Sequence, residues 1–136
     1  MIEGLIDEAM KARDFAYCPY SSYAVGACVE TTNGELFTGC NIENASYGLT
    51  ICAERIAVSK AVSDGVRSIK RIVIAGGRKG ADLCDMAYPC GACRQVIREF
   101  ANENAQIIVA RSRTDFKEYT LKDLLPDSFG PDNLKE

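Results

Sequence analysis

The sequence contains no histidine among its 136 residues. Catalytic arrangements that depend on imidazole, such as the Ser-His-Asp triad and the Cys-His pair, are therefore excluded in their usual forms. Zinc is commonly bound by cysteine, histidine and carboxylate side chains. Any zinc site in this chain must consequently be made from thiolates and carboxylates alone.

Basic charge and long apolar runs are also scarce. A net charge of −3 and an isoelectric point near 5.1 leave no basic surface of the kind that nucleic-acid-binding proteins present. No apolar run is long enough to span a bilayer. The N-terminal segment is amphipathic and acidic, unlike a signal peptide. We therefore expect a cytoplasmic protein with neither nucleic acid nor a membrane as a partner.

Cysteine, by contrast, is abundant. The chain carries seven cysteines, an odd number. In a reducing compartment such residues serve as buried apolar side chains, metal ligands or catalytic thiols more often than as disulfides. The candidates are Cys18, Cys28, Cys40, Cys52, Cys84, Cys90 and Cys93.

The length of 136 residues suits a single domain over residues 1–136. Helices are predicted over 2–16, 50–65, 90–102 and 120–126, and strands over 23–30, 35–42, 69–77, 105–112 and 116–120. Asn33 and Gly34 are expected to supply the positive φ angles of a tight hairpin between the first two strands. The order α-β-β-α-β-α-β-β-α predicts an α/β fold, a mixed sheet with helices packed on both faces.

Cys90 and Cys93, in "PCGACRQVI", lie at the start of a predicted helix and have three interpretations. A thiol-disulfide site needs a strand directly before the motif, whereas the loop 76–89 intervenes here. A closed structural zinc site would use four cysteines, with Cys52 and Cys84 completing the set. A catalytic zinc site would have three protein ligands and one open position.

The stretch "TICAER" favours the catalytic zinc site. Cys52 begins a predicted helix, as Cys90 does, and the partial positive charge of a helix N-terminus favours thiolate over thiol. Glu54 follows two residues after a proposed ligand, where a structural zinc has no use for a carboxylate but a catalytic zinc needs a base. Arg55 could donate hydrogen bonds to the ligand sulfurs and so moderate their negative charge.

Together these motifs make the chain recognisable. C-x-E followed by P-C-x-x-C is similar to the zinc deaminase signature H-x-E…P-C-x-x-C, with Cys52 in the histidine position. The segments "GCNIENASYGLTICAER", "KAVSDG" and "LLPDSF" also stand in family order. The sequence resembles the three-cysteine, homotetrameric class of cytidine deaminases, which act on free nucleosides.

This resemblance implies a reaction and a metal. Cys52, Cys90 and Cys93 are expected to bind one Zn²⁺ per chain, and Glu54 to shuttle protons without being a ligand. Zinc-bound hydroxide would attack C4 of cytidine or 2′-deoxycytidine, with uridine or 2′-deoxyuridine and ammonia as products. The role implied is pyrimidine salvage.

The resemblance also implies substrate contacts. Asn41 and Glu43, in "NIEN", are expected to hydrogen-bond the ribose 3′-hydroxyl. Tyr23 stands where the family usually carries phenylalanine, with its ring against the pyrimidine. Further contacts are expected from the backbones of Ala45 and Ala53, and from Tyr47 and Phe129, aromatics that the family inserts into a neighbouring subunit's pocket.

The sequence departs from the family pattern in the loop 76–89. This loop is longer than in short family members, carries the extra Cys84 and leads directly into a zinc ligand, so it is expected to border the substrate mouth. Two alternatives to cytidine deamination follow from it. The substrate could be a related aminopyrimidine nucleoside or a nucleoside antibiotic, and a non-catalytic zinc module could use Cys84 as its fourth ligand.

Overall fold

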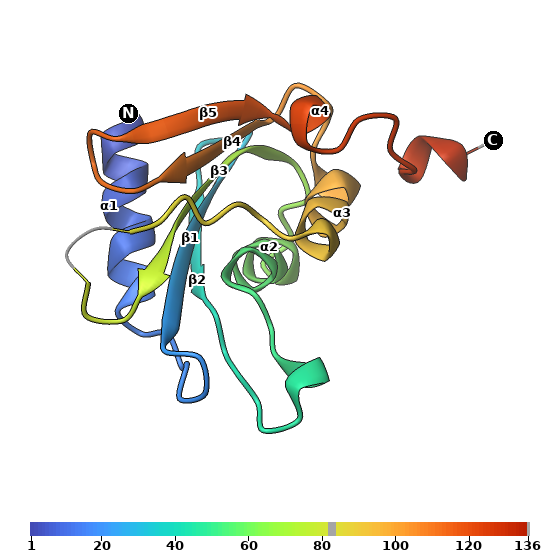
Figure 1. Cartoon of the computed structure of the whole chain (residues 1–136). Helices are drawn as coiled ribbons and strands as arrows, with labels where there is room; N and C mark the ends of the chain where they lie inside the picture. Colours follow the sequence, from blue (N-terminus) through green and yellow to red (C-terminus); the bar gives the residue numbers. More distant parts are fainter. Residues whose placement is uncertain (82–83, 136) are drawn as a thin grey trace.

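A five-stranded mixed sheet forms the centre of the computed structural model, which describes residues 1–81 and 84–135 (Figure 1). The strand order is β2-β1-β3-β4-β5. The strands are β1 (Tyr23–Thr31), β2 (Leu36–Cys40), β3 (Ile69–Arg78), β4 (Gln106–Ala110) and β5 (Phe116–Thr120). Only β3 and β4 pair in parallel, and the other neighbouring pairs are antiparallel.

Helices cover both faces of this sheet (Figure 1). Helix α1 (Ile2–Arg13) packs on one face, where Ile6 meets Val73 and Ile108. Helices α2 (Ala53–Ser63) and α3 (Gly91–Phe100) pack on the other, in a second core that includes Ile72 and Ile107. Alternate residues of β3 and β4 thus point into different cores, as the pleat of a strand requires. The predicted fold class is confirmed.

Two glycines allow the helices to lie unusually close to the sheet. A Cβ atom at Gly26 would lie 1.9 Å from the carbonyl oxygen of Ala9 in α1. A Cβ atom at Gly39 would lie 2.6 Å from the backbone nitrogen of Ala57 in α2. No side chain fits in either gap, so the position of α2 over β2 depends on Gly39.

Several element boundaries differ from the predicted ones. Helix α1 ends at Arg13 instead of residue 16, because the next amides bond to the third residue before them and tighten the chain. Helix α2 begins at Ala53, three residues later than predicted. In the β1–β2 hairpin only Gly34 has a positive φ, +88°, and Asn33 does not. The prediction of two positive φ angles there was wrong.

The remaining segments are short. Helix α4 (Leu121–Leu124) is capped by Thr120 as predicted, and the 3₁₀ turns η1 (Tyr47–Leu49) and η2 (Pro131–Asn133) were not predicted. The start of the predicted loop 76–89 belongs to β3, and Asp82 and Leu83 lie outside the described residues.

Candidate active site

The N-termini of α2 and α3 meet at one edge of the second core and bring three thiols together. Cys52 and Cys90 are the extended N-cap residues of these helices, and Cys93 lies in the first turn of α3. The sulfur of Cys90 is 4.0 Å from that of Cys52 and 3.4 Å from that of Cys93. All three sulfurs lie within 4.8 Å of one another.

This spacing fits a zinc ion. With Zn–S bonds of about 2.3 Å in a tetrahedron, neighbouring sulfurs stand about 3.8 Å apart. The separations of 4.0 and 3.4 Å lie close to that spacing, so Cys52, Cys90 and Cys93 would hold the ion with three protein ligands. Among the described residues, they are the one group of cysteines or carboxylates close enough to hold an ion in this way.

Hydrogen bonds to sulfur favour negative charge in the cluster. The Cys93 thiol and the Arg55 guanidinium, whose Nη2 lies 3.4 Å from the Cys52 sulfur, lower the pKa of Cys52 to about 5. The same contact with Cys52, together with burial, raises the pKa of Cys93. One thiol of the cluster is therefore readily ionised, as a metal ligand must be.

Glu54 lies beside the thiols without being one of the cluster. Its side chain is only 5 % exposed, and this burial raises the pKa of its carboxyl to about 7. A carboxyl whose pKa lies near neutrality can both take and give a proton. The geometry therefore gives Glu54 the properties of an acid-base group next to a metal position.

The thiols and Glu54 open onto a cavity of about 430 Å³, which we call the active-site cavity. Its volume lies within the usual range for small-ligand sites. It is lined by Tyr23, Val25, Asn41, Thr50, Cys52, Ala53, Glu54, Met86, Ala87, Tyr88 and Cys90. Six of these residues were predicted from the sequence as site residues. The other five, which sequence reasoning missed, are Val25, Thr50, Met86, Ala87 and Tyr88.

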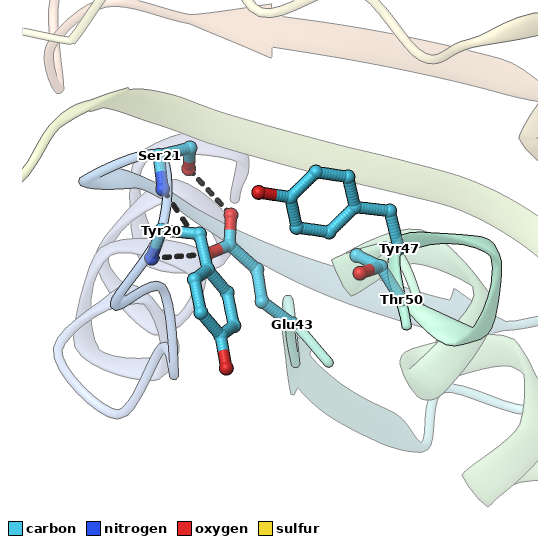
Figure 2. Close-up of a pocket in the computed structure, with 5 residues that line it drawn as sticks. All are labelled: Tyr20, Ser21, Glu43, Tyr47 and Thr50. Atoms are coloured by element: carbon cyan, nitrogen blue, oxygen red, sulfur yellow. Dashed lines mark hydrogen bonds between the residues drawn. The ribbon is translucent and has the colours of Figure 1, made fainter. Parts of the chain in front are cut away.

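Glu43 and Tyr47 lie in an adjacent cavity of about 370 Å³ (Figure 2). The Glu43 carboxylate accepts hydrogen bonds from the backbone amides of Tyr20 and Ser21, at 2.9 and 3.2 Å, and from the Ser21 hydroxyl. These bonds, led by the Ser21 hydroxyl, lower the pKa of Glu43. Thr50 lines both cavities, so the two are neighbours.

Asn41 has a structural task as well as a place in the active-site cavity. Its side-chain oxygen accepts from the Val25 amide at 2.9 Å, and its nitrogen donates to the Tyr23 carbonyl at 2.8 Å. Asn41 therefore fixes the start of β1, including the backbone of Tyr23. The contact of Asn41 with ribose stays a prediction.

Three other residues from the sequence predictions lie elsewhere. Ala45 and Phe129 are exposed and are not among the described residues that line the two cavities. Cys84 is buried in the core under α1, on the opposite face of the sheet from α2 and α3. The structure thus does not bring Cys84 to the other thiols.

Arg94, which sequence reasoning did not single out, braces the segment before Cys90. Its Nε donates to the Pro89 carbonyl at 2.7 Å and its Nη1 to the Leu124 carbonyl at 2.8 Å. The side chain thus ties α4 to the backbone immediately before a thiol of the cluster. An arginine directly after the second cysteine of a C-x-x-C motif was the available signal.

Comparison with known proteins agrees with this geometry. Residues 1–109 match the family profile of the cytidine and deoxycytidylate deaminase zinc-binding region. A cytidine deaminase of Sporosarcina psychrophila is 45% identical over 133 residues, which cover 98% of this chain and 94% of the relative. One from Halalkalibacterium halodurans is 42% identical, covering 97% of this chain and 96% of the relative.

Solved structures give the same result. The crystal structure of cytidine deaminase from Burkholderia pseudomallei superposes with a TM-score of 0.83 at 41% identity, covering 93% of this chain and 97% of that one. The enzyme from Mycobacterium tuberculosis gives a TM-score of 0.78 at 37% identity, covering 93% and 95% of the two chains. With its sequence, fold and thiol cluster in agreement, the chain belongs to the cytidine deaminase family of zinc-dependent hydrolases.

Proposed function

We propose that the protein hydrolyses cytidine and 2′-deoxycytidine to uridine and 2′-deoxyuridine, releasing ammonia, and so serves pyrimidine salvage. The observation that supports this most directly is the position of the buried Glu54 carboxylate beside the thiol cluster, at the wall of the active-site cavity. A structural zinc site needs neither an adjacent acid-base group nor an open cavity.

Cys52, Cys90 and Cys93 would hold one zinc ion. When bound, zinc supplies an acidified water molecule and a Lewis acid to the site. Glu54 would take a proton from the attacking water and deliver it to N3 of the pyrimidine, which would make C4 more electrophilic. Glu54 then carries a second proton to the amino group as it leaves as ammonia. Arg55 donates a hydrogen bond to the Cys52 sulfur and so would limit the negative charge that accumulates on the ligands.

The remaining predicted residues would bind the nucleoside. Tyr23 and the Ala53 backbone lie in the active-site cavity and would contact the base. Asn41 would meet the ribose 3′-hydroxyl, and Glu43 would do so from across Thr50. Ala45, Tyr47 and Phe129 would complete the site only after rearrangement or from a neighbouring subunit, because they lie outside this cavity.

The loss of cytidine absorbance on adding zinc-loaded protein tests the reaction. Both cytidine and 2′-deoxycytidine are expected to react, because each presents a 3′-hydroxyl to Asn41 and Glu43. Free cytosine lacks that group. A hydrogen bond to a charged group contributes about 1.5–3 kcal/mol, so free cytosine is expected to be poorer by about ten- to a hundredfold. Equal efficiency on free cytosine would contradict the assignment.

The same assay distinguishes the alternatives. A related aminopyrimidine nucleoside as the true substrate would show as a much higher kcat/KM than that for cytidine. A closed zinc module would bind metal and show no turnover. The burial of Cys84 on the opposite face of the sheet favours the open site.

We further propose that residues 1–136 act as one deaminase domain in a homotetramer. Tyr47 and Phe129 are 74% and 60% exposed, unusual for large aromatic side chains, and the exposed Tyr17 and Ile42 lie next to each other through a bridge between their backbones. We take these exposed apolar side chains as candidates for contact with a neighbouring subunit.

The seven cysteines are free thiols, which suits the reducing cytoplasm. No helix in the described ranges has both the length and the apolar character to cross a membrane.

A further inference from the structure

Two features that the family resemblance sets apart meet at the wall of the active-site cavity. One is Tyr23, which replaces a phenylalanine, and the other is the loop before Pro89. Tyr23 and Val25 are two apart on β1 and share a face of the sheet, the face that lines the cavity. Val25 stands opposite Gly76 of β3, and Gly76 pairs in turn with Asp85. Residues opposite one another share a face, so Asp85 lies on the same face as Tyr23.

Two adjacent glycines allow the loop to lie directly on β3. A Cβ atom at Gly76 would be 2.8 Å from that of Ala87, and one at Gly77 would be 3.0 Å from the Cα atom of Cys84. The Asp85 amide donates to the Gly76 carbonyl at 2.7 Å. Gly76 therefore places no side chain of its own between Val25 and Asp85.

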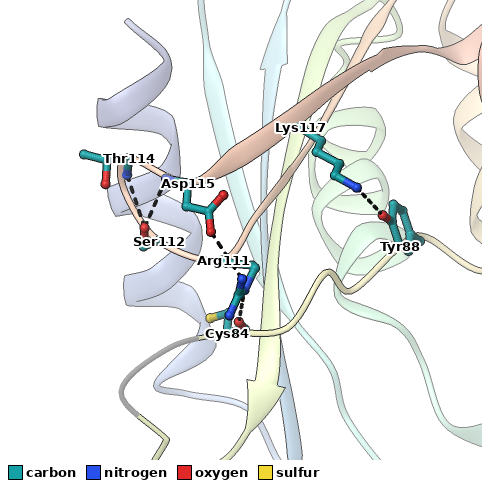
Figure 3. A network of polar contacts seen from close by, with 7 residues as sticks. All are labelled: Cys84, Tyr88, Arg111, Ser112, Thr114, Asp115 and Lys117. Carbon is teal, nitrogen blue, oxygen red and sulfur yellow. Dashed lines mark hydrogen bonds and ion pairs between the residues drawn. The ribbon is translucent and has the colours of Figure 1, made fainter.

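The segment that carries Asp85 is held at both ends (Figure 3). At its start, the Cys84 amide donates to the Arg111 carbonyl at 3.0 Å, and Arg111 Nε donates to the Cys84 carbonyl at 3.4 Å. At its end, Lys117 Nζ donates to the Tyr88 hydroxyl at 3.5 Å. These anchors, one directly after β4 and one on β5, fix the backbone of Asp85 relative to the sheet.

The Asp85 carboxylate acts on the Tyr23 phenol. Burial is the largest cause that raises the pKa of the Tyr23 phenol, and the charge and hydrogen bond of Asp85 raise it further. Arg13, whose guanidinium bonds to the carbonyls of Ala24 and Gly77, acts in the opposite direction. Tyr23 thus lines the cavity while the charge of Asp85, outside the lining, acts on its phenol.

We propose that the Asp85 carboxylate accepts a hydrogen bond from the Tyr23 hydroxyl across Gly76. Asp85 is then a positioning residue, which holds the Tyr23 ring as one wall of the active-site cavity and makes the loop before Pro89 part of the pyrimidine-binding site. This inference rests on the proposed function. A phenylalanine at position 23 has no hydroxyl to be held, so the family's usual residue needs no such partner. In this chain the orientation of the ring depends on a second residue.

The test is a double-substitution cycle on the zinc-loaded protein. Tyr23→Phe and Asp85→Ala are each expected to lower kcat/KM for cytidine by about three- to tenfold, mainly through KM, within the range of one hydrogen bond. The double variant is expected to be no worse than Tyr23→Phe alone, because Asp85 acts only through the Tyr23 hydroxyl. Glu118→Ala, which removes an exposed carboxylate from β5, is the control and should leave kcat/KM unchanged.

A spectroscopic readout tests the contact independently of turnover. In protein labelled at the tyrosine Cζ carbons, Tyr23→Phe identifies the Tyr23 resonance, and Asp85→Asn should lower its titration midpoint. An unchanged midpoint, or an Asp85→Ala penalty that persists in the Tyr23→Phe background, would overturn the proposal. If the parent protein does not deaminate cytidine, the proposed function fails, while the titration still decides whether Asp85 holds Tyr23.

Discussion

At the scale of single residues, Glu54 and the cysteines carry distinguishable tasks although they lie side by side. Cys52, Cys90 and Cys93 form a cluster in which each sulfur has another within reach. Glu54 is buried next to them but does not belong to the set whose atoms could share an ion. Metal binding and proton transfer should therefore be separable by substitution.

Glu54→Gln tests that separation. Glutamine keeps the size and reach of the side chain but cannot take a proton. Zinc content should remain at the level of the parent protein, and turnover should fall by at least the ~10²–10⁴-fold expected for loss of a general acid-base group. Metal content and kcat should be measured on one sample. Normal deamination with full zinc would exclude Glu54 as the proton shuttle.

Cys90→Ala is the matched comparison for Glu54→Gln. Removal of a ligand should abolish zinc binding and activity together and lower the midpoint of thermal unfolding, because metal binding is coupled to folding. A Cys90→Ala protein that retained its zinc would show that the ligand set is wrong.

Cys84→Ser tests the four-cysteine alternative. Cys84 is 4% exposed in the core under α1, and burial raises the pKa of its thiol, so it is a neutral core residue. The variant should keep its zinc and most of its activity, and lose about 1–3 kcal/mol of unfolding free energy from the buried hydroxyl. Metal analysis and urea denaturation check both statements, and loss of zinc would favour the closed site.

The thiol cluster could be identified from the sequence for two reasons. Two of its cysteines are close together in the chain, and the third stands, like them, at the start of a predicted helix. Cys90 and Cys93 share one turn, and the C-x-E spacing marks Cys52 and Glu54. The other wall of the cavity was not identifiable in detail. Met86 and Tyr88 reach it only because Gly76 and Gly77 let a loop lie on β3, a contact between segments with no shared periodicity.

At the scale of elements, the distance between α2 and the sheet determines the position of the site residues at the start of α2. Gly39 in β2 faces the backbone of Ala53 and Ala57, and Ala53 directly follows Cys52. A side chain at this position would push the start of α2 away from the sheet. Since the start of α2 carries Cys52 and Glu54, a displacement there reaches the site directly.

Gly39→Ala should therefore destabilise the protein and reduce activity. The added methyl would lie 2.7 Å from the Ala53 carbonyl oxygen, and overpacking of this kind typically costs about 1–3 kcal/mol. Gly4→Ala is the control, because a Cβ atom there has no described neighbour within 4 Å and α1 should gain about 0.5–1 kcal/mol. Urea denaturation of both variants measures the difference, and equal stability would contradict the close approach.

The elements themselves were largely predictable, because buried positions recur with the period of a helix or a strand. Their ends were not. Residues 14–16 continue an apolar pattern, yet α1 stops at Arg13, whose side chain bonds to carbonyls of β1 and β3. The end of α1 therefore depends on hydrogen-bond partners that are distant in sequence, and the periodicity of apolar residues does not reveal them.

At the scale of the whole molecule, the exposed aromatic side chains point to assembly. Tyr47 packs its ring against Tyr20, with centroids 5.9 Å apart, but remains largely open to solvent (Figure 2). The carbonyl of Phe129 is held by Gln95 of α3 at 2.9 Å, while its side chain stays exposed. Each aromatic group is thus available to a second subunit.

Light scattering of the active protein should give the mass of a tetramer, about four times 14.8 kDa. Tyr47→Ala and Phe129→Ala should raise KM or weaken assembly without loss of zinc, whereas Phe15→Ala, an exposed aromatic at the end of α1, serves as the control. An active monomer would overturn the proposed assembly.

The brace formed by Arg94 also bears on where the protein could be divided. The region matched by the family profile ends at residue 109 and contains each proposed zinc ligand. Arg94, however, donates hydrogen bonds to the carbonyls of both Pro89 and Leu124, and β4 pairs with β5. Leu124 and β5 both lie beyond residue 109. A fragment cut there would expose an unpaired strand edge and release the backbone before Cys90. The region that matches the family profile is thus shorter than the smallest fragment that we expect to fold. A fragment that keeps the thiol cluster in place must also include β5 and α4.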